Sequence, residues 1–301
     1  MSSRKTSAAL WIAAFAVTVL LAAFQRMTGP SYPIRGTEAL PNGETVSYSL
    51  PRSNEGRDEL RIGIRAPSNA TRANLEWRRY PTDEPFQRQT MTANADGEFE
   101  TRIPPQPAAG KVEYRILLEF ADGVISIPES EAVVARYRAG VPAHVLIPHI
   151  LAMFLSMLVS SRALFEVLRP GARRARGLVL IAMALLVIGG LMLGPIVQRF
   201  AFGAYWTGWP YGHDLTDNKT LIAFLAWLPA TILAWRRANT RLAVTLGWVV
   251  MMGIFLIPHS ARGSQLDWSE VDNGPENARF QIGHGTTPYT GGWIWNLTSG
   301  I

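Results

Sequence analysis

The sequence predicts a membrane protein of mixed α and β structure, in which an N-terminal anchor precedes a β-sandwich domain and a four-helix transmembrane bundle. Two observations lead to this fold class. Apolar runs close to bilayer-spanning length occur at residues 8–24 and repeatedly between residues 141 and 258. Between them lies a charged segment with short stretches of alternating apolar residues, which is the pattern of half-buried strands.

The composition excludes several classes of protein. The chain has 301 residues and a net charge of +6, and many of its arginines flank the apolar runs. This placement is typical of membrane topology, and the sequence has no basic stripe of the kind that binds nucleic acid. The absence of cysteine excludes disulfides, cysteine-ligated clusters and CxxCH haem attachment. P-loop, GxSxG, HExxH and dinucleotide-binding motifs are also absent, which argues against an enzyme.

Residues 1–26 form the predicted anchor. Arg4 and Lys5 precede the apolar run, which suits a cytoplasmic N-terminus. A cleaved signal peptide is the competing interpretation, but the nearest A-x-A motif, at residues 14–16, falls inside the apolar run. We therefore expect a retained span.

Residues 27–140 carry the pattern of an extracytoplasmic β-domain. Short alternating segments recur between turn signals, and residues 111–120 and 123–127 form the strongest predicted hairpin. Such a series of short strands predicts an antiparallel β-sandwich of immunoglobulin-like or fibronectin-like architecture, with Trp77 in its core. A copper site of the cupredoxin type is excluded because this segment contains neither histidine nor cysteine.

Residues 141–258 are predicted to form the four-helix bundle. The arginine-rich loops within 161–176 and 236–241 are expected on the cytoplasmic side, which leaves loop 198–219 and the tail 259–301 outside. The chain would thus cross the cytoplasmic (inner) membrane five times, with the C-terminus and β-domain on the periplasmic side. The four spans of the bundle are expected at residues 141–164, 177–197, 221–235 and 242–258.

Prolines and glycines within the spans predict local geometry. Pro148 and Pro229 should kink or locally unwind their helices. Small residues at a helix face allow close packing in a membrane, so the GxxxG pair Gly190 and Gly194 predicts a helix–helix contact. Two further glycines of the last span, at positions 247 and 253, indicate the same. The tail after residue 258 shows no helical or strand periodicity, and its aromatic residues favour an irregular strap over the outer face.

The outer loop concentrates residues that could carry chemistry. His213, Asp214 and Asp217 could hold a divalent transition metal, because His213 and Asp217 stand four residues apart at a helix start. The alternative is that Thr216 or Asp217 caps the following helix. The aromatic residues of the loop predict either a belt at the lipid headgroups or a partner-binding surface, to which the tail would add its own aromatics. This partner-binding set is Trp206, Trp209, Tyr211, Trp293 and Trp295.

Two membrane histidines form a second candidate site. His149 lies inside a predicted span, where an ionisable residue is a functional candidate, and His259 follows the last span. Facing imidazoles on two helices could bind a b-type haem or a transition metal. The alternatives are a hydrogen bond from His149 to a neighbouring helix and a favourable interaction of His259 with a helix C-terminus.

Two functions remain open from the sequence. The first is a non-catalytic accessory or scaffold subunit without a cofactor, which docks membrane or periplasmic proteins through its β-domain, outer loop and tail. The second is a membrane redox or metal-handling protein that uses the outer-side histidines.

Overall fold

The computed structural model describes residues 3–40, 43–55, 58–67, 69–95, 97–170, 174–258, 266 and 268–273. These residues belong to two compact units. One unit contains the apolar helices, and the other contains the strands together with a short helix near the C-terminus. The mixed α and β class predicted from the sequence is therefore confirmed.

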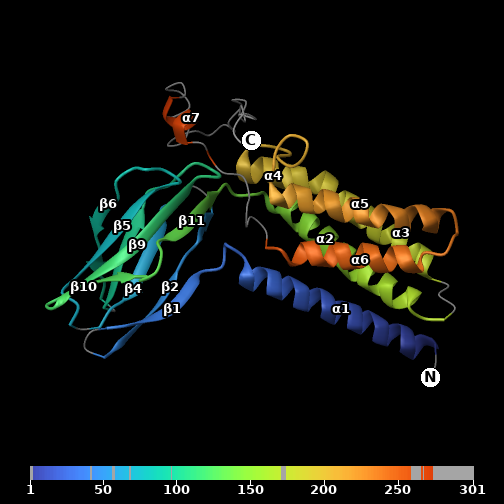
Figure 1. Ribbon diagram of the computed structural model, residues 1–301, viewed down its shortest axis with the longest axis horizontal. Coiled ribbons are helices and arrows are strands. Elements are labelled where there is room, and N and C mark those ends of the chain that lie inside the picture. The colour runs from blue at the N-terminus through green and yellow to red at the C-terminus, as the bar shows by residue number, and fades with distance from the viewer. Residues whose placement is uncertain are drawn as a thin grey trace. The chain divides into compact units, whose positions relative to one another are not determined.

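The helices of the first unit lie side by side (Figure 1). α1 contacts α2 and α6, so the N-terminal helix packs within this unit. α2 also packs against α3, and α5 packs against both α3 and α6. The helices are α1 (Ser3–Thr28), α2 (Ala143–Val167), α3 (Ala175–Leu186), the π-helix η1 (Val187–Leu193), α4 (Gly194–Phe202), α5 (Leu215–Trp235) and α6 (Arg241–Leu256).

Among the residues that the structure describes, four segments of this unit are long and apolar enough to cross a bilayer, namely Lys5–Thr28, Ala143–Val167, Ala175–Phe202 and Leu215–Trp235. α6 is also apolar, but it has only 16 residues. Two predicted boundaries were too narrow. The third segment continues through η1 to Phe202, and α5 begins at Leu215, six residues before the expected start at residue 221.

The prolines do not unwind their helices. α2 and α5 continue through Pro148 and Pro229, so the expected local unwinding at these residues was wrong, whereas a kink stays a prediction. The helix widens instead at η1, which contains Gly189 and Gly190. A Cβ at position 189 would lie 2.9 Å from the Cβ of Ala152, so the glycine lets η1 approach α2 closely.

Strand β9 (Lys111–Phe120) organises the second unit. β5 (Arg72–Tyr80) pairs along one edge of β9, and β10 (Gly123–Ile127) and β11 (Val133–Arg138) share the other. The antiparallel β9–β10 hairpin is the one predicted from the sequence. This largest sheet has the order β3-β11-β9-β5-β6, and among the strands that the structure describes only β3 and β11 pair in parallel. Two smaller antiparallel sheets have the orders β1-β2 and β4-β8-β7. Their strands, with the remaining two, are β1 (Ile34–Ala39), β2 (Thr45–Leu50), β3 (Ser53–Glu55), β4 (Leu60–Arg65), β6 (Gln87–Thr90), β7 (Thr92–Ala93) and β8 (Glu98–Ile103).

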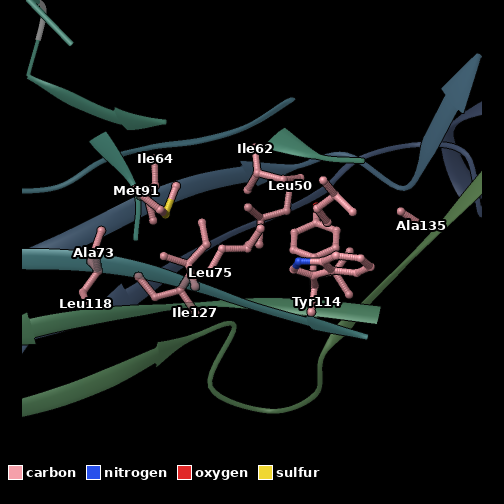
Figure 2. Close-up of a cluster of buried hydrophobic side chains, with 14 of the residues drawn as sticks. Leu50, Ile62, Ile64, Ala73, Leu75, Met91, Tyr114, Leu118, Ile127 and Ala135 are labelled. Atoms are coloured by element: carbon pink, nitrogen blue, oxygen red, sulfur yellow. The ribbon is translucent and has the colours of Figure 1, made fainter. Parts of the chain in front are cut away.

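The three sheets share one apolar core (Figure 2). Leu50 of β2, Ile62 of β4 and Leu75 of β5 contribute fully buried side chains to it. Trp77 is 7% exposed and belongs to the same core, as the sequence predicts. The Tyr114 hydroxyl donates to the Pro51 carbonyl at 2.7 Å, so this buried phenol keeps a hydrogen-bond partner.

The C-terminal tail contains one described element. α7 (Trp268–Asn273) is a helix of 6 residues that belongs to the strand-containing unit. Its presence corrects the expectation of an entirely irregular tail, since six residues are too few to show a periodic pattern. Leu266 and Trp268 are both buried, at 5% and 6% exposure.

Candidate functional site

The segment between α4 and α5 is folded around one buried carboxylate. Asp217, in the first turn of α5, is 5% exposed. Its Oδ2 atom accepts hydrogen bonds from the backbone N–H groups of Thr207 at 2.6 Å and Gly208 at 3.0 Å. The side-chain amide of Gln198, on α4, donates to the same oxygen at 3.0 Å. The carboxylate thus pins the loop to the ends of two helices.

Close approach explains the glycine beside this carboxylate. A Cβ at position 208 would lie 2.6 Å from the Cβ of Asp217. A larger residue at Gly208 would therefore push the loop away from α5 and lengthen the hydrogen bonds to Asp217.

Asp214 caps α5. Its side chain accepts hydrogen bonds from the backbone N–H groups of Thr216 at 2.7 Å and Asp217 at 3.4 Å. The predicted cap at Thr216 or Asp217 was therefore wrong, because the helix begins at Leu215. The start of α5 at Leu215 and its cap at Asp214 were missed for the same reason. The polar first turn of α5 is stabilised by contacts with the loop, and such contacts leave no periodic pattern in the sequence.

The three proposed metal ligands do not gather in one place. His213 is exposed, Asp214 faces the helix N-terminus, and Asp217 faces the loop backbone. In the part of the chain that the structure describes, no three His, Asp or Glu side chains are placed to hold a metal ion. Both carboxylates already accept the backbone N–H groups that a cation would compete with.

The aromatic residues of the loop separate into an inner and an outer set. Trp206 is partly buried, and its indole N–H donates to the Trp209 carbonyl at 3.1 Å. The residues Tyr205, Trp209 and Tyr211 are 60%, 67% and 67% exposed. The backbone N–H of Trp209 donates to the Asn218 side chain at 2.7 Å, which ties the outer set to α5. Trp293 and Trp295 lie outside the described residues.

A buried lysine lies two residues after Asp217 in α5. Lys219 is 1% exposed, and its ammonium group donates to the carbonyl oxygens of Ile257 at 2.7 Å and Pro258 at 3.2 Å. These carbonyls follow α6 and would otherwise lack helical partners. The Gln25 side chain of α1 donates to the Phe255 carbonyl at 2.8 Å in the same region. The start of α5 and the ends of α1 and α6 thus meet at one end of the helical unit.

His149 is the second predicted candidate. Its Nδ1 lies 2.8 Å from the carbonyl oxygen of Gly189, in η1. With the proton on Nδ1, this contact is a hydrogen bond to a neighbouring helix, and the lone pair remains on Nε2. His259 lies outside the described residues, so the proposed pairing of the two imidazoles stays a prediction.

A second buried polar cluster was missed by the sequence reasoning. Arg162 was assigned to a cytoplasmic loop, but it lies within α2 and is 2% exposed. It forms an ion pair with Glu166 at 2.8 Å, and its guanidinium lies 5.7 Å from the centre of the Trp11 ring on α1. The i, i+4 spacing of the two charges was the available signal.

This cluster also reaches α6, where the Trp248 indole donates to the Ser161 hydroxyl at 3.0 Å. It lies toward the C-terminal end of α2, whereas His149 lies near the start of that helix. The contacts therefore join α1, α2 and α6 through polar side chains, as interhelical hydrogen bonds do in membrane proteins.

Comparisons with known proteins place no family name on this chain. No protein-family description matches it. A search of curated proteins likewise found no relative.

Proposed function

We propose that this protein is a non-catalytic accessory or scaffold subunit of the cytoplasmic membrane that docks a membrane or periplasmic protein through its outer loop. The observation behind the proposal is that the charged and the aromatic side chains of residues 203–219 have different surroundings. The ionisable side chains Asp214, Asp217 and Lys219 are engaged in building the loop and its helix ends, while aromatic rings face outward. His213, Tyr205 and Tyr211 of this segment are exposed, but both carboxylates and the lysine that could assist them in catalysis are engaged in building the loop and helix ends.

The proposed topology has five spans, with the N-terminus in the cytoplasm and the β-domain outside. The arginine-rich loops favour this orientation. The contact of Lys219 with the residues after α6 favours a fifth crossing, because α5 and α6 then run as a complete antiparallel pair. We further infer that the strands form an immunoglobulin-like sandwich, which the common core of the three sheets supports.

The exposed aromatic rings are suited to protein recognition. Tyr and Trp bring large contact areas at low conformational cost and dominate the energetics of many interfaces. Tyr205, Trp209 and Tyr211 are held on a loop whose backbone is fixed by Asp217 and Asn218. A fixed loop loses little entropy on binding, which favours affinity. Headgroup contact alone would not require such a pinned backbone.

Site-specific photo-crosslinking in native membranes tests this proposal. A photoreactive phenylalanine analogue at positions 209 and 211 should give the same discrete protein adduct. Trp235 is the matched control, since it is 73% exposed at the other end of α5. That position should give no such adduct. Lipid adducts alone at all three positions would contradict partner docking and support a simple aromatic belt.

Haem or metal binding is the second candidate function, and it rests on His149. A ligating imidazole commonly has its other ring nitrogen bound to a carbonyl, and His149 has this arrangement with Gly189. π-helical segments such as η1 are also frequent at functional sites. An absorption spectrum and metal analysis of purified protein separate this candidate from the first. A His149→Gln variant should lose the signal if His149 is a ligand.

A further inference from the structure

α7 is attached to the strand-containing unit by a small set of specific contacts. The indole N–H of Trp268 donates to the Tyr80 carbonyl at 3.0 Å. One edge of the same ring lies against Gly110, where a Cβ would come within 3.2 Å of it. The ring is also 4.9 Å, measured to its centre, from the guanidinium of Arg79. Burial of such a ring commonly dominates the energy of a contact.

Arg79 forms the polar half of this contact. Its Nη1 and Nη2 atoms donate to the two carboxylate oxygens of Asp272, each at 2.8 Å. Such a bidentate pairing between guanidinium and carboxylate is both strong and directional. Trp268 and Asp272 are four residues apart, so one helical face presents both side chains to Arg79.

The receiving surface is built without help from α7. Glu84 accepts hydrogen bonds from Nε and Nη2 of Arg79 and so holds the guanidinium in place. The pKa of Arg79 is raised, first by the hydrogen bond to Glu84 and then by that to Asp272. Arg79 and Tyr80 end β5, which pairs with the central strand β9. The surface is therefore attached to the most regular part of the unit.

The bound segment, in contrast, is weakly organised by itself. A helix of 6 residues is far below the length at which isolated helices are stable in water. Its side chains Trp268 and Asp272 contact the receiving surface, and Leu266 just before the helix is buried. Its occupancy thus depends on being joined to the same chain, which keeps its effective concentration high. A preformed surface with a weakly structured, tethered occupant is open to exchange.

We propose that Arg79, Tyr80 and Gly110 form a docking site for helical peptides with the pattern Trp-x-x-x-Asp, which α7 occupies in cis. The partner chemistry is an aromatic residue followed one turn later by a carboxylate. α7 then controls access to the site, since a partner segment binds only when α7 is displaced. This site is separate from the outer loop and does not depend on the function proposed for it.

Peptide binding to the full-length protein tests the proposal. The probe is a fluorescein-labelled peptide with the sequence of residues 264–275, and the readout is fluorescence anisotropy. A Trp268→Ala/Asp272→Asn variant should bind the probe saturably, whereas the parent chain should bind it at least tenfold more weakly, because its own α7 competes. A probe that carries the same two substitutions should not bind either protein.

Two controls keep the outcome interpretable. The first control adds Arg79→Gln to the Trp268→Ala/Asp272→Asn variant, here called the unlatched variant, and should abolish probe binding. An unchanged circular dichroism spectrum and melting curve would show that the β-domain of this triple variant is still folded. Trp235→Ala, which changes an exposed tryptophan elsewhere, should leave the parent's weak binding unchanged. The proposal is overturned if the folded unlatched variant binds the probe no better than the parent chain.

Discussion

Buried charges in the helical unit are balanced by backbone groups as well as by opposite charges. Asp217 accepts from two backbone N–H groups, and Lys219 donates to two backbone carbonyls. Arg162 and Glu166, in contrast, form a buried ion pair with each other. The helix start that carries Asp217 and Lys219 thus satisfies loop and helix ends that would otherwise face an apolar environment.

Removal of the Asp217 carboxylate should therefore be strongly destabilising. Asp217→Ala leaves the N–H groups of Thr207 and Gly208 and the Gln198 amide without their acceptor, at a cost of about 3 kcal/mol or more. Asp214→Ala is the matched comparison, because loss of a helix cap costs only about 0.5–2 kcal/mol. Thermal unfolding of both variants in detergent measures the difference. Equal stabilities would refute the central role assigned to Asp217.

Two buried phenols predict a loss of stability in alkali. Burial raises the pKa of both Tyr114 and Tyr137 above their ordinary value of about 10. Below that pH both phenols are neutral in the folded and unfolded chains, so their contribution to stability is fully present. Above it the unfolded chain releases protons that the folded chain retains, so the free energy of unfolding falls as the pH rises toward the folded pKa values.

Tyrosine absorbance during alkaline titration checks this prediction. The chain has 8 tyrosines, and part of the phenolate signal should appear only when the β-domain unfolds. In a Tyr114→Phe/Tyr137→Phe variant this late component should disappear. A parent chain whose tyrosines all titrate reversibly near pH 10, with the fold intact, would show that the two phenols are not protected.

At the scale of elements, the sequence was a good guide wherever a pattern is local. The β9–β10 hairpin follows from alternation and a turn signal, and the apolar runs located the helices that are long and apolar enough to cross a membrane. The early start of α5 was hidden because Asp217 and Lys219 look unsuited to an apolar helix until their distant partners are known. The same reason conceals Arg162 and α7. Their signals depend on contacts across the fold, which hydropathy does not report.

Glycines 247 and 253 of α6 provide a matched test of helix packing. A Cβ at position 247 would lie 2.8 Å from the Ala226 carbonyl of α5, whereas nothing lies within 4 Å of one at position 253. Gly247→Ala should therefore push α5 and α6 apart and lower the unfolding temperature. Gly253→Ala should be neutral or slightly stabilising, because alanine favours a helix by about 1 kcal/mol over glycine. Similar effects of both substitutions would contradict the close α5–α6 contact.

The β-domain should fold without the helices. Among the described residues, the buried apolar cluster of this domain runs from Leu40 to Tyr137, so a fragment of residues 32–138 contains it. We expect this fragment to melt cooperatively, and Trp77→Ala to destabilise it by about 3–5 kcal/mol. Val124→Ala, at a site that is 58% exposed, should have little effect. A fragment without a cooperative melt would count against an independent core.

At the scale of the whole molecule, the number of membrane crossings depends on whether α6 spans the bilayer. Four helical segments have the length of a membrane span, and α6, with 16 residues, falls short of the usual ~20. If α6 failed to cross, the C-terminus would lie with the arginine-rich loops. The contact of Lys219 with Ile257 and Pro258 argues against this, because it joins the residues after α6 to the start of α5. A tilted neighbour or a locally thinner bilayer can accommodate a short span.

Labelling of single cysteines tests this topology directly, since the chain has no native cysteine. Ser53→Cys and His213→Cys should react with an impermeant reagent added outside, whereas Arg237→Cys should react only after the membrane is opened. Arg173 and Ser299, two further positions for which the sequence gave an orientation, lie outside the described residues. Ser269→Cys tests whether α6 crosses the membrane, because Ser269 is exposed and belongs to the same compact unit as the strands. Five crossings require it to react from the outside together with Ser53→Cys, and reaction from the cytoplasmic side alone would leave four.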